Sequence, residues 1–119
     1  MDNFRFEDLE IWQESVDLGD RLFDIADIAE RKKLYRFAEQ LRGCGLSISN
    51  NIAEGSGSHS DKEFAHYLNI ARRSVFECAN VTIIFHRRNL IDSNLRANLL
   101  NKLNRLSKRI NTFRRTLLP

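Results

Sequence analysis

The sequence predicts an all-α protein, a single domain over residues 1–119 built as an antiparallel up-down-up-down four-helix bundle. Proline, which interrupts helices, occurs only as Pro119. Apolar residues recur at helical spacing along four segments, and short polar links separate these segments. Short links place consecutive helices side by side in opposite directions. The chain is long enough to bury a core without a metal ion or a disulfide bond.

The first predicted helix, from Phe6 to about Ala29, carries two apolar stripes. One stripe consists of Leu9, Trp12, Val16, Phe23 and Ala26. The other lies about 120° round the helix and consists of Ile11, Leu18, Leu22 and Ile25. Together they cover roughly 200° of the circumference, whereas a one-sided surface helix needs about 100°. We therefore expect the second stripe to form the interface of a homo-oligomer.

The other three helices follow heptad-like apolar seams. The second helix is expected from about Leu34 to Glu54, the third has a seam from Phe64 to Phe85, and the fourth from Leu99 to Leu117. Gly43 and Gly45 lie inside the second helix, where each costs about 1 kcal/mol. We expect the close approach of a neighbouring helix to compensate for this cost.

The segment "NNIAEGSGSHSDKEF", residues 50–64, raises the alternatives of a phosphate-binding loop and a corner between helices. A dinucleotide-binding loop needs a third glycine, where this chain has Ser60, and a P-loop needs a G-K-[S/T] tripeptide that does not occur. Gly55 instead fits a left-handed residue that ends the second helix. Ser60 and Glu63 fit a capping box that begins the third helix. The sequence therefore favours a corner.

A longer stretch, "SISNNIAEGSGSHSDKEFAHYLNIARRSVFE", resembles the signature of the 23S rRNA intervening-sequence protein family. That signature reads S-I-x-x-N-I-A-E-G, then S-x-x-E-F, then I-A-x-x-S-x-x-E. The stretches "FEDLEIWQESVDL" and "LYRFAEQLRGCGLSI" are similar to the family's first two helices. One departure is "DIAERKKL", where the family often has a proline between helices one and two.

The resemblance implies a four-helix protomer that assembles into a ring-like pentamer. Members of the family are encoded within intervening sequences of ribosomal RNA genes, or elsewhere. A similar fold serves as the accessory protein of diversity-generating retroelements, where a basic pentamer contacts RNA and reverse transcriptase. The resemblance thus implies that the chain is its own partner, and it points to RNA or a nucleoprotein as a further one.

The residues that match the family motif have structural interpretations. Asn51, Glu54 and Gly55 fall on the N-I-A-E-G positions, where we expect them to satisfy backbone groups at the corner or to form a subunit contact. No nucleophile or base lies at a diagnostic spacing from them in the sequence, which argues against a catalytic role. Ser74 and Glu77 match the S-x-x-E positions beside the third seam, which favours a polar contact between helices.

Metal and thiol chemistry have weak signals. Glu63 and His66 have the E-x-x-H spacing of di-iron bundles, but the chain has no second copy of this motif, so we expect no metal and no cofactor. Cys44 and Cys78 lie on the seams of helices two and three. Counting from the corner, their heights differ by roughly 10 Å, which is too far for a disulfide bond. We expect both to be buried and reduced.

Charge is unevenly distributed along the chain. Residues 1–60 hold 7 Lys/Arg against 12 Asp/Glu, and residues 61–119 hold 12 against 4. The candidate nucleic-acid-binding residues on the fourth helix are Lys102, Arg105, Lys108, Arg109, Arg114 and Arg115. These cations could contact RNA phosphates without sequence preference. Alternatively, they could pair with the acidic first helix, inside the protomer or across a subunit interface.

The sequence thus predicts a non-enzymatic homo-oligomer that binds RNA or a nucleoprotein through its basic fourth helix. The alternative is a structural or protein-interaction scaffold, for example accessory to a reverse transcriptase, with no direct nucleic-acid binding. No run of eighteen apolar residues occurs, and the N-terminus is acidic where a signal peptide is basic. We therefore expect a cytoplasmic protein with no membrane partner.

Overall fold

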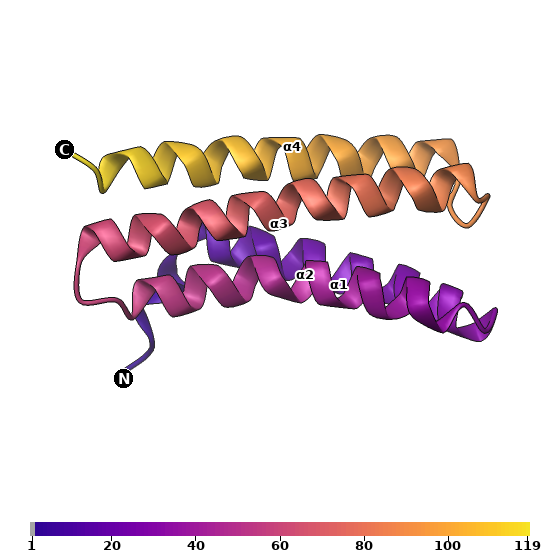
Figure 1. Cartoon of the computed structure of the whole chain (residues 1–119), viewed down its shortest axis with the longest axis horizontal. Coiled ribbons are helices and arrows are strands. Elements are labelled where there is room, and N and C mark those ends of the chain that lie inside the picture. Colours follow the sequence, from indigo (N-terminus) through magenta and orange to yellow (C-terminus); the bar gives the residue numbers. More distant parts are fainter. Residues whose placement is uncertain (1) are drawn as a thin grey trace.

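The computed structural model describes residues 2–119, which form four α-helices, a short 3-10 helix and no strand (Figure 1). The elements are η1 (Arg5–Asp8), α1 (Glu10–Arg31), α2 (Tyr35–Ser56), α3 (Asp61–Arg87) and α4 (Ser93–Thr116). The prediction of an all-α protein is confirmed. The first helix begins later than expected, because the chain from Arg5 to Asp8 forms the separate 3-10 turn.

Successive helices run in opposite directions along the 45 Å long axis of the molecule (Figure 1). Contacts between α2 and α3 follow this arrangement, since residue numbers fall along one helix as they rise along the other. The contacting pairs are Phe37–Phe85, Ser47–Ser74 and Glu54–Tyr67. Each helix packs extensively against the next one in the chain, whereas α1 and α4 touch only sparsely.

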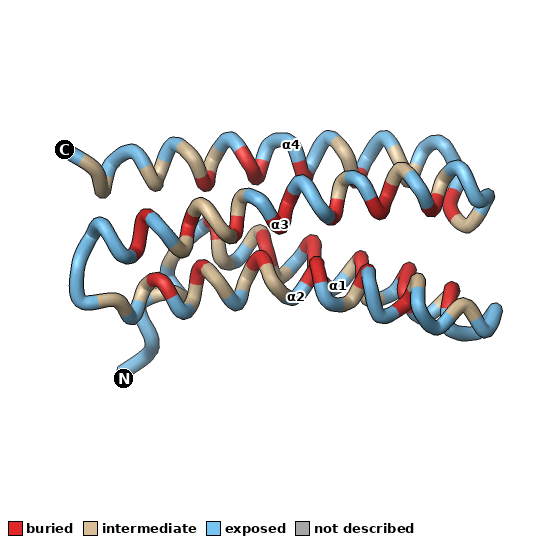
Figure 2. Tube along the Cα trace, viewed as in Figure 1, coloured by how far each residue is buried: buried red, intermediate tan, exposed pale blue. Residues whose placement is uncertain are grey.

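The core lies along the facing sides of the helices, where buried positions recur about once per turn (Figure 2). The seams predicted for the last three helices are buried as expected along most of their length, whereas Leu34, Phe37, Phe113 and Leu117 at their outer ends are half-buried. In α4 the fully buried residues are Leu99, Leu103, Leu106 and Ile110. In α3 the seam continues from Phe64 through Leu68, Ala71 and Val75 to Phe85. The strict alternation of three and four residues keeps each seam on one side of its helix.

The expected oligomer interface on α1 is wrong. Ile11, Leu18, Leu22 and Ile25 are all buried in the core of the protomer, none more than 6% exposed. Ser15, which is fully buried, lies between Ile11 and Leu18 and completes the heptad seam that these residues form. Its hydroxyl donates a 2.6 Å hydrogen bond to the carbonyl of Ile11, so its polar group is satisfied inside the core. The half-buried stripe is the other one, which includes Trp12, Val16 and Phe23.

Two glycines allow α1 and α2 to approach closely. A Cβ atom on Gly45 would lie 3.3 Å from Leu22 Cδ1, and one on Gly19 would lie 3.7 Å from the carbonyl oxygen of Gly45. The expected compensation for a glycine inside the second helix is therefore present at Gly45. It is absent at Gly43, where a Cβ atom would enter open space.

Gly55 does not end α2 in a left-handed conformation, so that prediction is wrong. The helix continues to Ser56, and no glycine among residues 2–119 has a positive φ. Gly55 is buried against α3, where a Cβ atom would lie 2.6 Å from Tyr67 Cβ and 2.9 Å from Phe64 Cδ1. A side chain is excluded at this position because α3 packs against it, whereas the helical backbone conformation of Gly55 would allow one.

Ser60 is the N-cap of α3, as predicted. Its side-chain oxygen accepts a 3.1 Å hydrogen bond from the backbone N–H of Glu63. A capping box would also contain a hydrogen bond from the Ser60 N–H to the Glu63 carboxylate, and these two residues do not form it. The cap therefore rests on the serine alone.

The two remaining corners share one backbone design. Lys33 after α1 and Asn89 after α3 adopt left-handed conformations, with φ of 63° and 61°. The next residue in each case, Leu34 or Leu90, donates its N–H to a carbonyl five residues back, at 2.9 Å. This is the Schellman pattern, in which a hydrophobic residue after the turn packs back on the helix. Both leucines pack against the core.

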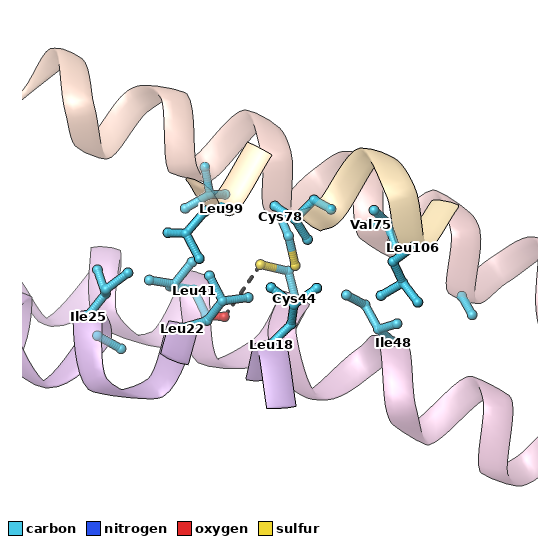
Figure 3. Close-up of a cluster of buried hydrophobic side chains, with 14 of the residues drawn as sticks. Leu18, Leu22, Ile25, Leu41, Cys44, Ile48, Val75, Cys78, Leu99 and Leu106 are labelled. Carbon is cyan, nitrogen blue, oxygen red and sulfur yellow. Dashed lines mark hydrogen bonds between the residues drawn. The ribbon is translucent and has the colours of Figure 1, made fainter. Parts of the chain in front are cut away.

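Cys44 and Cys78 face each other across the α2–α3 interface (Figure 3). Both thiols are free and buried, as expected. The neighbouring Cys44 thiol, together with burial, raises the pKa of the Cys78 thiol. The predicted offset between the two residues is wrong, because the loop carries the chain past the end of α2 before α3 begins (Figure 1). The register of the two helices is shifted accordingly.

Candidate nucleic-acid interface

Helix α4 separates an apolar seam from a polar face. Its N-terminus is fixed by Asp92, whose carboxylate accepts a 2.8 Å hydrogen bond from the N–H of Leu95. The buried leucines of the seam then determine which side of the helix faces the core. The six candidate cations consequently lie outside the core, four of them exposed and two, Arg109 and Arg114, half-buried.

Arg109 is committed to the acidic helix α1. Its guanidinium contacts the Glu10 carboxylate at 2.5 Å and also forms an ion pair with Glu14. The Arg109 and Glu14 side chains are each about one-third exposed, so water screens this network only in part. At this position the alternative interpretation of the basic row, pairing with the first helix, is correct.

Lys102 and Arg105 lie near the same acids without forming ion pairs. Together with Glu14, Asp17 and Arg21 they line a groove along the α1–α4 seam. Both cations are exposed. The groove places carboxylates opposite them, which lowers the positive potential that these two side chains offer to a phosphate.

Arg114, Arg115 and Lys108 continue the cationic face toward the C-terminus. Lys108 and Arg115 are exposed. Arg114 lines a hollow with Lys62 and His66 of α3, and its Nε atom has no hydrogen-bond partner among the residues described. The six candidates thus do not form one uniform surface, because α1 neutralises one part of the row.

A polar contact joins α2 and α3 at the family-motif positions. The Ser47 and Ser74 hydroxyls lie 2.8 Å apart, and the Asn51 amide donates to the Ser47 carbonyl at 2.8 Å and to its hydroxyl at 3.1 Å. The polar helix–helix contact predicted for Ser74 is therefore present. Glu77 does not take part, because its side chain is exposed.

Glu54 meets a residue that the sequence alone did not single out. The Tyr67 hydroxyl lies 3.4 Å from the Glu54 carboxylate. The negative charge of Glu54 is the main cause of a raised pKa for the Tyr67 phenol. Tyr67 lacked a signal of its own, and Ser47, the first residue of the S-I-x-x-N-I-A-E-G signature, was given no role, because both contacts depend on the register between α2 and α3.

Metal ligands do not cluster on this surface. Within residues 2–119, no group of three or more His, Cys, Asp or Glu side chains is placed to hold a metal ion. Glu63 and His66 are both exposed on α3. None of the helices in the same range has the length and apolar content needed to cross a bilayer.

The fold and its surface define a small four-helix protein with a polar α2–α3 contact and a cationic fourth helix. The model of the 23S rRNA-intervening sequence protein family matches residues 7–112, and the chain belongs to this family. The family resemblance drawn from the motif is confirmed. A search among curated proteins finds no match.

Proposed function

We propose that this protein is a non-enzymatic homo-oligomer, a ring-like pentamer by family resemblance, that binds RNA in the cytoplasm without sequence preference. The observation that carries this proposal is the set of cations on α4. Among residues 2–119, only Arg42 and Arg109 form ion pairs, so none of the other five candidates on α4 is held by a carboxylate. Such side chains bind phosphates in any sequence, and repetition in an oligomer multiplies the contacts.

The test removes charge from α4 and measures RNA affinity. A variant with Lys102→Gln, Arg105→Gln and Lys108→Gln should bind fluorescent single-stranded RNAs of unrelated sequence more weakly and to an equal degree. Its log–log salt slope should be flatter by about 0.7 for each phosphate that the variant no longer binds. The comparison is Arg109→Gln, which should weaken RNA binding less than Arg105→Gln alone, because Glu10 and Glu14 already occupy the Arg109 guanidinium. Failure of the unaltered protein to bind RNA at low salt refutes the proposal.

The second candidate function is a protein-interaction scaffold without direct nucleic-acid binding. It is favoured by large exposed apolar side chains, Phe76 at 58% and Leu46 at 49% exposure. Arg109 also shows that part of the basic helix serves internal pairing. Loss of a protein partner on Phe76→Glu, with RNA binding absent from the start, would support this candidate.

A further inference from the structure

The end of the bundle that holds the α1–α2 and α3–α4 corners gathers cations from segments far apart in the chain. Both corners lie at the same end of the molecule (Figure 1). Phe37 at the start of α2 packs edge-on against Phe85 at the end of α3, with ring centroids 5.8 Å apart, which ties the two corners together. The basic end, as we name it, consists of Arg31, Lys32, Lys33, Arg36, Arg87, Arg88 and Arg96. Six of these side chains are exposed and Arg96 is half-buried.

The acids at this end are already engaged. The ranges 30–36 and 87–96 contain seven Lys/Arg and two acids, Glu30 and Asp92. Glu30 binds Arg42 at 3.2 Å, and Asp92 caps α4 through the N–H of Leu95. No cation of the basic end has a carboxylate within ion-pair distance among residues 2–119. The basic end therefore differs from α4, where acids of α1 face the row.

The opposite end of the bundle has a different balance. Residues 2–8, 54–63 and 114–119 meet there, with both chain termini and the α2–α3 loop (Figure 1). These ranges contain four Lys/Arg against six Asp/Glu. Charge is thus separated along the long axis, with the positive end confined to the 27 × 23 Å cross-section of the bundle.

Helix stability does not account for the basic end. Arg31 and Arg87 lie in the last turns of α1 and α3, where a cation interacts favourably with the helix dipole. Arg36 and Arg96, however, lie in the first turns of α2 and α4, which contain no acid, and there the dipole disfavours a cation. Lys33 adopts a left-handed conformation that glycine or asparagine adopts more readily. Three of the seven cations thus lie where local structure favours another residue.

We propose that the basic end is a binding surface for the phosphate backbone of RNA. This inference rests on the proposed RNA binding and assigns it a surface separate from the α4 row. Seven cations that form no ion pair within residues 2–119 lie in one cross-section, where they can follow a flexible single strand and bind it without reading bases. An extended acidic protein is the competing partner, and the experiment separates the two.

The test uses the three cations that local structure disfavours. A variant with Lys33→Gly, Arg36→Gln and Arg96→Gln should melt at the same temperature as the unaltered protein or a few degrees higher, because strain and dipole repulsion are removed. Its affinity for single-stranded RNA should fall roughly tenfold, with a flatter salt slope. Weaker binding by a more stable protein separates phosphate contact from damage to the fold.

A matched control removes the same charge elsewhere. Arg5→Gln, Arg72→Gln and Arg73→Gln lie outside both the basic end and α4, and this variant should retain affinity within about twofold. An equal loss in the control shows that net charge governs binding and overturns the inference. Unchanged affinity at the basic end, with a loss on the α4 variant, overturns the inference and leaves the proposed function standing. If the unaltered protein binds no RNA but binds poly-glutamate through the basic end, both this inference and the proposed RNA binding are wrong, and the partner is an acidic protein.

Discussion

Gly55 determines how closely α3 can cross the end of α2. Its missing side chain leaves room for Tyr67 and Phe64, and a Cβ atom there would come within 2.6 Å of Tyr67 Cβ. Gly43 lies on a different face of the same helix, where a Cβ atom would meet nothing within 4 Å. The two glycines of α2 therefore have opposite consequences for the same substitution.

We predict that Gly55→Ala lowers the free energy of unfolding by about 1–3 kcal/mol, because the added methyl group overpacks the α2–α3 contact. Gly43→Ala should raise it by about 1 kcal/mol, because alanine favours the helix and meets no obstacle. Urea unfolding of both variants measures the difference. Equal effects at the two positions would contradict the close approach at Gly55.

At the scale of helices, the α1–α4 pair is held differently from the others. The consecutive helices share broad apolar contacts, whereas α1 and α4 meet along a groove bordered by charged side chains. Arg109 bridges this groove to Glu10 and Glu14. Electrostatic pairing thus supplements the sparse packing that closes the bundle.

We predict that Arg109→Gln lowers the free energy of unfolding by about 1 kcal/mol at low salt, since one side chain contacts two carboxylates. The effect should shrink at about 1 M salt, where the screening length is about 3 Å. The control is the neighbouring Lys108→Gln, an exposed cation without an ion pair among residues 2–119. A destabilisation that is independent of salt would indicate packing by the arginine stem instead.

Sequence periodicity located three seams correctly and misread one. The seams of α2, α3 and α4 keep their heptad spacing, with the single polar residue Thr82 in α3, so this spacing identifies them directly. In α1 the polar Ser15 interrupts the seam, and only its bond to the Ile11 carbonyl makes it a core residue. Gly55 was assigned to the correct corner for the wrong reason, since a glycine required by a neighbouring helix looks in sequence like a glycine required by a turn.

At the scale of the whole molecule, charge is separated along the long axis as well as along the sequence. Read in order, the chain divides into an acidic first half and a basic second half. The structure joins "ERKKLYR" from the first half to "RRNL" from the second at one end. This surface was missed because no sequence window contains both corners, and their proximity follows only from the folded arrangement of four helices.

The proposed homo-oligomer needs a new interface, because the stripe first assigned to it is core. The large apolar side chains still exposed include Leu46 on α2 and Phe76 on α3. Leu46 borders a hollow with Phe23 beside the open position at Gly43, and Phe76 borders another with Ala79 and Leu100. Exposed apolar side chains beside such hollows are typical of surfaces that bury against a partner.

We predict that Leu46→Glu together with Phe76→Glu dissociates the oligomer and leaves the helical protomer folded, because both side chains are about half exposed. Leu22→Ala should instead destabilise the protomer by about 2–5 kcal/mol, since Leu22 is fully buried. Sedimentation velocity measures assembly, and circular dichroism during heating measures folding. If the unaltered protein is a monomer at micromolar concentration, the proposed homo-oligomer is wrong. If Leu22→Ala dissociates an oligomer without loss of stability, the assignment of the interface to Leu46 and Phe76 is wrong.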